Sequence, residues 1–162
     1  MKKNISPEIM RDRSKEKGYQ RLGTRSPRCA KCGETDPSCL IRNRTKIICY
    51  ECSSIDSGRS PIEDHHPAGK KNDHFTVPVP GNDHRILSEF QRIWPETTLR
   101  NPRKSPLRRA SAMLRGFLDI LRLMIDRILG WIPEFMESLD EALTDIHGDQ
   151  WWIKILERKE DE

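Results

Sequence analysis

Residues 29–52 read CAKCGETDPSCLIRNRTKIICYEC, a segment that begins with one Cys-X-X-Cys pair and ends with a second. Sixteen residues separate the two pairs. That spacing is typical of a structural site in which four thiolates hold Zn²⁺ in a tetrahedron. The predicted zinc ligands are Cys29, Cys32, Cys49 and Cys52.

The residues between the two pairs predict a small β-hairpin. Residues 39–42 and 46–48 are rich in apolar and β-branched residues, and a polar turn at 43–45 joins them. Gly33 follows the first pair at a place where the backbone needs a positive φ. The segment is therefore predicted to be a zinc ribbon, with Cys39 as a buried apolar residue rather than a ligand.

Composition excludes several classes of protein. The chain of 162 residues is 35% hydrophobic and 33% charged, with a mean hydropathy of −0.77. No run approaches the ~18 uncharged apolar residues of a spanning helix, and the polar N-terminus does not look like a secretory signal. Five cysteines, an odd number, argue against a disulfide framework and predict a reducing, cytoplasmic setting.

Charge is distributed unevenly along the chain. Residues 1–31 carry 10 Lys/Arg and 3 acidic residues, whereas residues 134–162 carry 3 and 10. The first segment predicts a basic flexible arm over residues 1–26 that contacts DNA phosphates. The alternative is a solvated N-terminus without a partner.

The histidines lie in a second patterned segment. Residues 62–66, IEDHH, predict a short strand that ends in a histidine pair, and residues 76–79 predict a second strand. Asn82 is predicted to cap a helix that runs to about residue 93 and carries His84 in its first turn. The order of elements is therefore strand, loop, strand and helix.

This unit resembles the HNH, or ββα-metal (His-Me finger), endonuclease family. The resemblance implies that His65 and His84 bind a divalent metal such as Mg²⁺, Mn²⁺ or Zn²⁺ and that His66 is the general base. Asn72 or Thr76 would orient the His66 ring. A base with a near-neutral pKa and a metal that stabilises charge suit hydrolysis of a DNA phosphodiester bond.

The resemblance covers about residues 28–95 and has departures. Pro80 and Asp83 stand where many family members carry a cysteine pair, and Ser88 stands where a further ligand is common. The third metal ligand is left open between Asp64, Asp83 and Ser88. An inactive zinc-ribbon module that binds nucleic acid or protein is the alternative to an endonuclease.

Residues 106–147 predict two amphipathic helices. The first starts at Ser105-Pro106 and ends at Gly130, and the second lies between Pro133 and Gly148. The predicted apolar face of the first helix comprises Ala110, Met113, Leu114, Phe117, Leu118, Leu121, Met124, Ile125 and Ile128, opposite charged residues that include Asp119. We expect a helical hairpin that packs on itself, on the rest of the protein or on a partner chain through residues 106–147. A membrane-surface helix over residues 107–132 is an alternative.

The predicted fold class is α+β. Its parts are the basic arm (1–26), the zinc ribbon with an HNH-like ββα unit (27–94), a Pro-rich linker (95–105), and a helical hairpin with an acidic tail (106–162). Trp151 and Trp152 are expected to cap the hairpin rather than to stack on bases.

Overall fold

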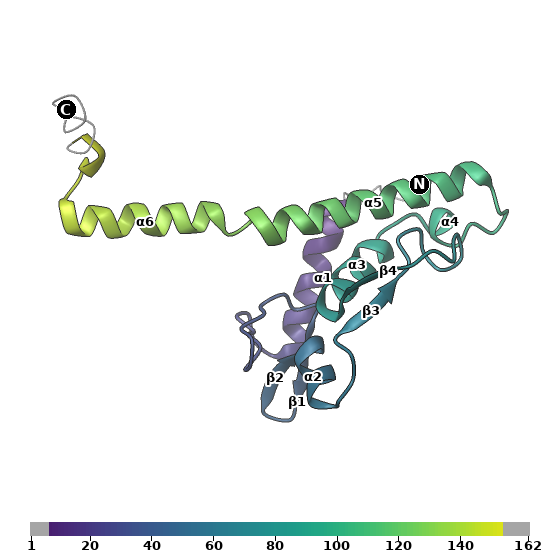
Figure 1. Ribbon diagram of the computed structural model, residues 1–162, viewed down its shortest axis with the longest axis horizontal. Coiled ribbons are helices and arrows are strands. Elements are labelled where there is room, and N and C mark those ends of the chain that lie inside the picture. Colours follow the sequence, from purple (N-terminus) through teal and green to yellow (C-terminus); the bar gives the residue numbers. More distant parts are fainter. Residues whose placement is uncertain (1–6, 154–162) are drawn as a thin grey trace. The chain divides into compact units, whose positions relative to one another are not determined.

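The computed structural model describes residues 7–153 and is mostly helical, with two small antiparallel sheets (Figure 1). It divides into two compact units, with the boundary between Leu123 and Met124. No helix in the described part of the chain is long and apolar enough to cross a membrane. The elements are α1 (Pro7–Leu22), β1 (Leu40–Asn43), β2 (Lys46–Cys49), α2 (Tyr50–Asp56), β3 (Ile62–His65), β4 (Val77–Pro80), α3 (Gly81–Arg92), α4 (Glu96–Leu99), α5 (Pro106–Leu129) and α6 (Ile132–His147).

The first sheet is the hairpin predicted between the two cysteine pairs. Strands β1 and β2 pair antiparallel, with Leu40 opposite Cys49 and Asn43 opposite Lys46. Arg44 takes a positive φ of 54° in the turn. Strand β2 ends at Cys49 and α2 begins at the next residue, so the second cysteine pair lies at the start of a helix. The α+β class and a four-cysteine unit compatible with a zinc ribbon are confirmed.

The second sheet leads directly into a helix, which gives the order β3, β4 and α3 that the sequence predicts (Figure 1). His65, the last residue of β3, lies opposite Val77 in the antiparallel pair. The expected cap is wrong, however, because the N-cap of α3 is Pro80. Asn82 instead accepts a hydrogen bond from Glu51 N at 3.3 Å, while Asn82 N donates to Glu51 Oε1 at 3.0 Å. This reciprocal pair joins the starts of α2 and α3.

Most of the expected basic arm is a docked helix. Residues 7–22 form α1, and Leu22 is fully buried against Leu40 and two of the cysteines. Arg21 Nη2 donates to Pro37 O at 2.8 Å and to Leu40 O at 3.0 Å, and Ser14 Oγ donates to Glu89 Oε2 at 2.9 Å. Polar contacts of this kind hold α1 in place, and they leave no apolar pattern in its sequence that would predict a packed helix. Residues 1–6 of the arm lie outside the described residues.

Helix α5 faces the core with a side that the sequence did not predict. Its buried residues are Ala112, Gly116, Asp119 and Leu123, at spacings of four, three and four. Gly116 allows the closest approach, because a Cβ there would lie 1.9 Å from Pro67 O. Asp119, expected on the solvent face, is 3% exposed and accepts a hydrogen bond from Trp94 Nε1 at 2.9 Å. The units therefore divide inside α5, not at the linker predicted over residues 95–105.

The second unit contains the end of α5 and the helix α6. Gly148 ends α6 with a φ of 80°, in agreement with the predicted C-terminal signal. Trp151 Nε1 donates to Asp140 Oδ1 at 2.9 Å, so this side chain lies back against the middle of α6. None of the described residues of α6 is buried.

Candidate functional site

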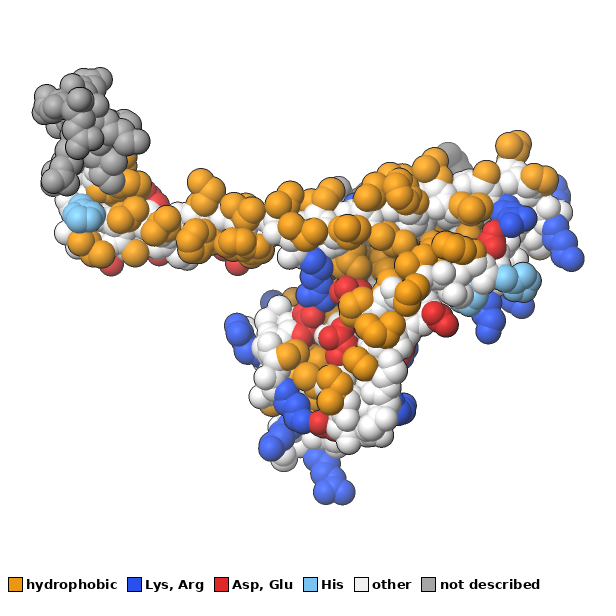
Figure 2. Space-filling view, viewed as in Figure 1, with side chains coloured by type: hydrophobic (Ala, Val, Ile, Leu, Met, Phe, Trp, Pro, Cys, Tyr) orange, Lys and Arg blue, Asp and Glu red, His pale blue; other side chains and the backbone are white. Residues whose placement is uncertain are grey.

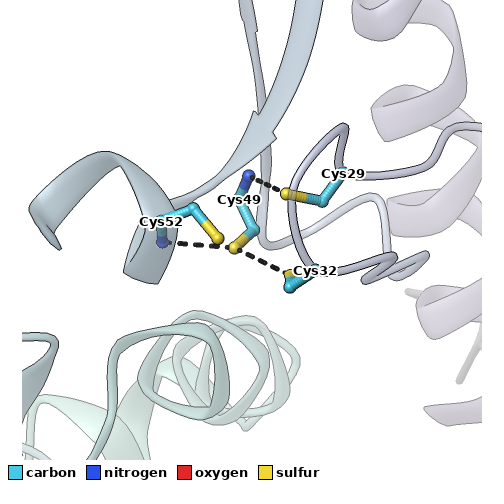
Figure 3. A group of neighbouring side chains, drawn as sticks. All are labelled: Cys29, Cys32, Cys49 and Cys52. Carbon is cyan, nitrogen blue, oxygen red and sulfur yellow. Dashed lines mark hydrogen bonds between the residues drawn. The ribbon is translucent and has the colours of Figure 1, made fainter. Parts of the chain in front are cut away.

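The structure brings the four predicted cysteines together. Their sulfur atoms all lie within 4.8 Å of one another, and no other cluster of three or more potential ligands occurs among residues 7–153. Figure 3 shows two of the cysteines on the loop after α1 and the other two at the junction of β2 and α2. Cys39 lies outside this cluster and is fully buried among Ile86, Leu87 and Leu123, as predicted.

Backbone N–H groups point at the sulfur atoms. Cys49 N donates to Cys29 Sγ at 3.3 Å, and Cys52 N donates to Cys49 Sγ at 3.4 Å, which caps α2 (Figure 3). Burial raises the pKa of Cys29, but N–H groups of Cys32, Lys31 and Cys49 outweigh it and lower that pKa to about 6. The thiolate is the form of cysteine that binds metal. The surroundings of Cys29 therefore favour the metal-binding form of that side chain.

The cluster has the dimensions of a four-thiolate metal site. A Zn–S distance of about 2.3 Å in a tetrahedron requires sulfur atoms about 3.8 Å apart. Cys32 Sγ and Cys49 Sγ are 3.6 Å apart. Gly33, with its φ of 82°, turns the chain behind the first pair, as predicted. These four residues could therefore hold a metal ion such as zinc, with no coordination position left open for a substrate.

Two of the predicted histidines meet in the ββα unit. His65 at the end of β3 and His84 in the first turn of α3 have ring centroids 5.3 Å apart in an edge-to-face arrangement. His84 Nδ1 lies 2.7 Å from Glu63 Oε2. A carboxylate at one ring nitrogen is the partner that metal-binding histidines commonly have, and it leaves Nε2 as the free nitrogen.

Sequence reasoning missed Glu63 and named Asp64 instead. Side chains alternate along a strand, so Glu63 and His65 share one face of β3 and Asp64 points to the other. Asp64 is exposed, whereas Glu63 also accepts a hydrogen bond from Arg85 Nη2 at 3.3 Å. The period of two was visible in the sequence and would have selected Glu63.

Gln91 is the second residue that sequence reasoning missed. Its Nε2 lies 2.7 Å from His66 O, 3.1 Å from Pro67 O and 3.3 Å from His65 Nε2. It stands seven residues after His84, two turns along the same face of α3. Gln91 therefore fixes the backbone after β3. It contacts Nε2 of the His65 ring and not Nδ1.

The two residues predicted to orient the His66 ring, Asn72 and Thr76, do not contact it through hydrogen bonds. Asn72 Nδ2 donates to Ala68 O at 2.9 Å and also reaches the carbonyls of Thr98 and Leu99. Within the described residues, neither Asn72 nor Thr76 is hydrogen-bonded to His66, whose Nδ1 is buried and has no hydrogen-bond partner. Asn72 thus shapes the loop that carries His66 rather than its ring.

Burial sets the charge state of the two facing histidines. His65 is 2% exposed, and burial, with smaller contributions from His84 and His66, lowers its pKa to about 4. Burial also lowers the pKa of His84, against the opposing effect of Glu63. Both imidazoles are therefore neutral at pH 7, and only a neutral imidazole can bind a metal.

The chain was compared with protein-family models, with curated proteins and with solved structures. None of these comparisons found a match. What the molecule does must therefore be inferred from the geometry of its four cysteines and three histidines.

Proposed function

We propose that the protein is a metal-dependent endonuclease of the HNH type that hydrolyses DNA phosphodiester bonds. The observation that carries the proposal is the meeting of His65 and His84 at 5.3 Å, because one ends a strand and the other begins the helix that follows. The order β3, β4 and α3 matches the ββα arrangement that the sequence resemblance implies. Two lysines, Lys70 and Lys71, are exposed on the loop after His66, where they can contact phosphate.

Each residue of the unit has a distinct part in this proposal. His84, oriented by Glu63, and His65 hold a divalent metal, which supplies stabilisation of the charge that develops on the phosphate. His66 accepts the proton of the attacking water. Gln91 holds the His66 carbonyl and so fixes the backbone from which that ring projects.

In the same proposal, zinc at the four cysteines is structural. The metal fixes the start of α2, and Glu51 on that helix is hydrogen-bonded to Asn82 at the start of α3. His84 follows two residues later. Zinc therefore supports the position of His84 without taking part in the reaction.

An inactive module that binds nucleic acid or protein is the second candidate function. It is favoured by the contact between Gln91 Nε2 and His65 Nε2 and by the small number of ligands around the histidines. Ser88 is only half-buried, and its hydroxyl is a poor metal ligand. The side chain of Pro80 has no atom that could bind a metal. In this candidate the histidines serve packing only.

A plasmid-nicking assay separates the two candidates. Supercoiled DNA is incubated with the wild type in Mg²⁺, Mn²⁺ or Zn²⁺, beside His66→Ala and a matched control, His74→Ala, which alters an exposed histidine of the same loop. We expect nicking by the wild type and by His74→Ala, and none by His66→Ala. Equal nicking by His66→Ala would remove that residue from the mechanism, and no nicking in any metal would favour the inactive module.

A further inference from the structure

Helix α5 has two opposite faces, and only one of them is covered. Ala112, Gly116, Asp119 and Leu123 are buried. At 100° per residue, Leu114, Phe117, Leu121 and Ile128 lie on the other side of the helix. These four side chains are 37–60% exposed, and they recur at spacings of three, four and seven. The broad apolar face identified in the sequence therefore faces outward.

Helix α6 continues the same pattern. Phe135, Leu139 and Ile146 lie on one side and are 45–73% exposed. A helix of sixteen residues is marginal in water without tertiary packing of its apolar side. Figure 2 shows hydrophobic side chains along both α5 and α6. We call the apolar residues of these two faces the α5 stripe and the α6 stripe.

The two stripes have polar borders of opposite charge. Helix α5 carries five arginines and two aspartates, and one of these aspartates, Asp119, is buried. Helix α6 carries five acidic residues and neither lysine nor arginine. A partner that suits both must present an acidic amphipathic helix to α5 and a basic one to α6.

We propose that the partner is a second copy of this chain. In a two-fold, antiparallel dimer, α5 of each copy packs its stripe against the α6 stripe of the other, so that each arginine-rich border meets an acidic one. Such an isologous interface uses the same two helices from both copies. The charge pattern disfavours an anionic lipid surface, because the five acidic residues of α6 would be repelled by it.

The stripes are large enough for a stable dimer. Phe117 of the α5 stripe, Phe135 of the α6 stripe and Trp131, which lies between the two helices, are each more than half exposed. An aromatic side chain buries about 150–250 Å², so these three alone would contribute about 240–420 Å² of the about 800 Å² per partner found in a specific interface. The aliphatic residues of the two stripes supply the remainder.

The first test measures the mass of the full chain in solution. Light scattering after size exclusion should give twice the chain mass of 18.9 kDa. The double variant Phe135→Glu/Leu139→Glu should dissociate with a dimerisation constant about 100-fold weaker. Ser138→Glu adds one such negative charge at an exposed position beside the α6 stripe and should remain a dimer. Neither Phe135 nor Leu139 is buried, so no core contact is lost in the variant.

A charge-reversal pair tests the antiparallel arrangement. One variant carries Arg115→Glu and Arg127→Glu on α5, and the other carries Glu134→Arg and Asp145→Arg on α6; all four positions are exposed and flank the stripes. Each variant alone places like charges across the interface and should be largely monomeric. Mixed together, they should form a heterodimer, because both α5–α6 contacts then pair opposite charges.

Three results would overturn the proposal. A wild-type monomer at all concentrations would mean that the helices of one chain cover each other. Binding of a monomer to phosphatidylglycerol vesicles would assign the stripes to a membrane surface. A dimer whose reversed variants fail to combine would exclude the pairing of α5 with α6.

Discussion

Glu63 shows how much one side chain can contribute to the histidine site. Its Oε2 lies 2.7 Å from His84 Nδ1, and its Oε1 accepts from Arg85. The carboxylate therefore selects the orientation of the His84 ring and leaves Nε2 for a ligand. Asp64, the adjacent carboxylate, lies on the other face of β3 and is exposed.

We expect Glu63→Gln to weaken the binding of Mn²⁺ by about 10–100-fold, the usual loss when a carboxylate partner of a metal-binding histidine is removed. Isothermal titration calorimetry of the wild type and the variant measures the two dissociation constants for Mn²⁺. Asp64→Asn is the matched control, since it removes an equal charge from the neighbouring residue, and it should bind Mn²⁺ as the wild type does. Equal losses in both variants would indicate a general effect of charge rather than a role in positioning His84.

The four-cysteine cluster joins the loop after α1 to the junction of β2 and α2. It lies beside a small core of Leu22, Leu40 and Cys49. So small a core contributes little by itself, and a structural metal is the usual way to stabilise such a unit. The hydrogen bonds between Glu51 and Asn82 then connect the start of α2, which the cluster fixes, to the start of α3.

Cys49→Ser should abolish stoichiometric zinc binding and lower the melting temperature, because metal binding and folding are linked in such units. Zinc content by atomic emission and a thermal melt measure the two effects. Cys39→Ser is the control: it alters a buried cysteine outside the cluster, so it should cost stability and still bind one zinc ion. Unchanged zinc in Cys49→Ser would contradict a four-thiolate site.

The elements that could be predicted from the sequence are those with local signals. The Cys-X-X-Cys pairs, the hairpin between them and the order β3, β4 and α3 all follow from short patterns, and the structure confirms them. The core face of α5 could not be predicted in this way. It uses Ala112, Gly116 and Asp119, which do not stand out by hydrophobicity, beside a more apolar face that is exposed.

The candidate site shows the same limit. His65, His66 and His84 were found because histidine pairs and a helix-borne histidine form a visible motif. Glu63 and Gln91 matter through their position in three dimensions, and a glutamine two turns along a helix is inconspicuous in a sequence. Asn72 was found, but its actual role is to hold the loop carbonyls.

Across the first unit as a whole, Arg11 connects three helices. Its guanidinium lies 4.4 Å above the Phe90 ring of α3, and its Nη2 is 3.7 Å from Asp119 Oδ1 on α5. Asp119 is almost fully buried, and Arg122 at 3.1 Å is its other cationic partner. Arg11 thus helps to compensate a buried charge.

Arg11→Ala should lower the free energy of unfolding by about 1–2 kcal/mol, because it removes a cation–π contact and part of the compensation of Asp119. Urea denaturation measures the change. Arg13→Ala removes an arginine from the same helix and should change stability by less than about 0.5 kcal/mol. A similar loss in both variants would assign the effect to the charge of α1 in general.

The contact between Arg11 and Asp119 also has a consequence for the order of events on the ribosome. Helix α1 is synthesised before its partner on α5, which emerges more than a hundred residues later. The first unit therefore cannot close during translation until residue 123 has left the exit tunnel, and α1 waits beside the cysteine hairpin as an incompletely packed helix. The exposed apolar residues of α5 and α6 emerge just as this packing becomes possible, so the nascent chain presents them before its first unit has finished folding.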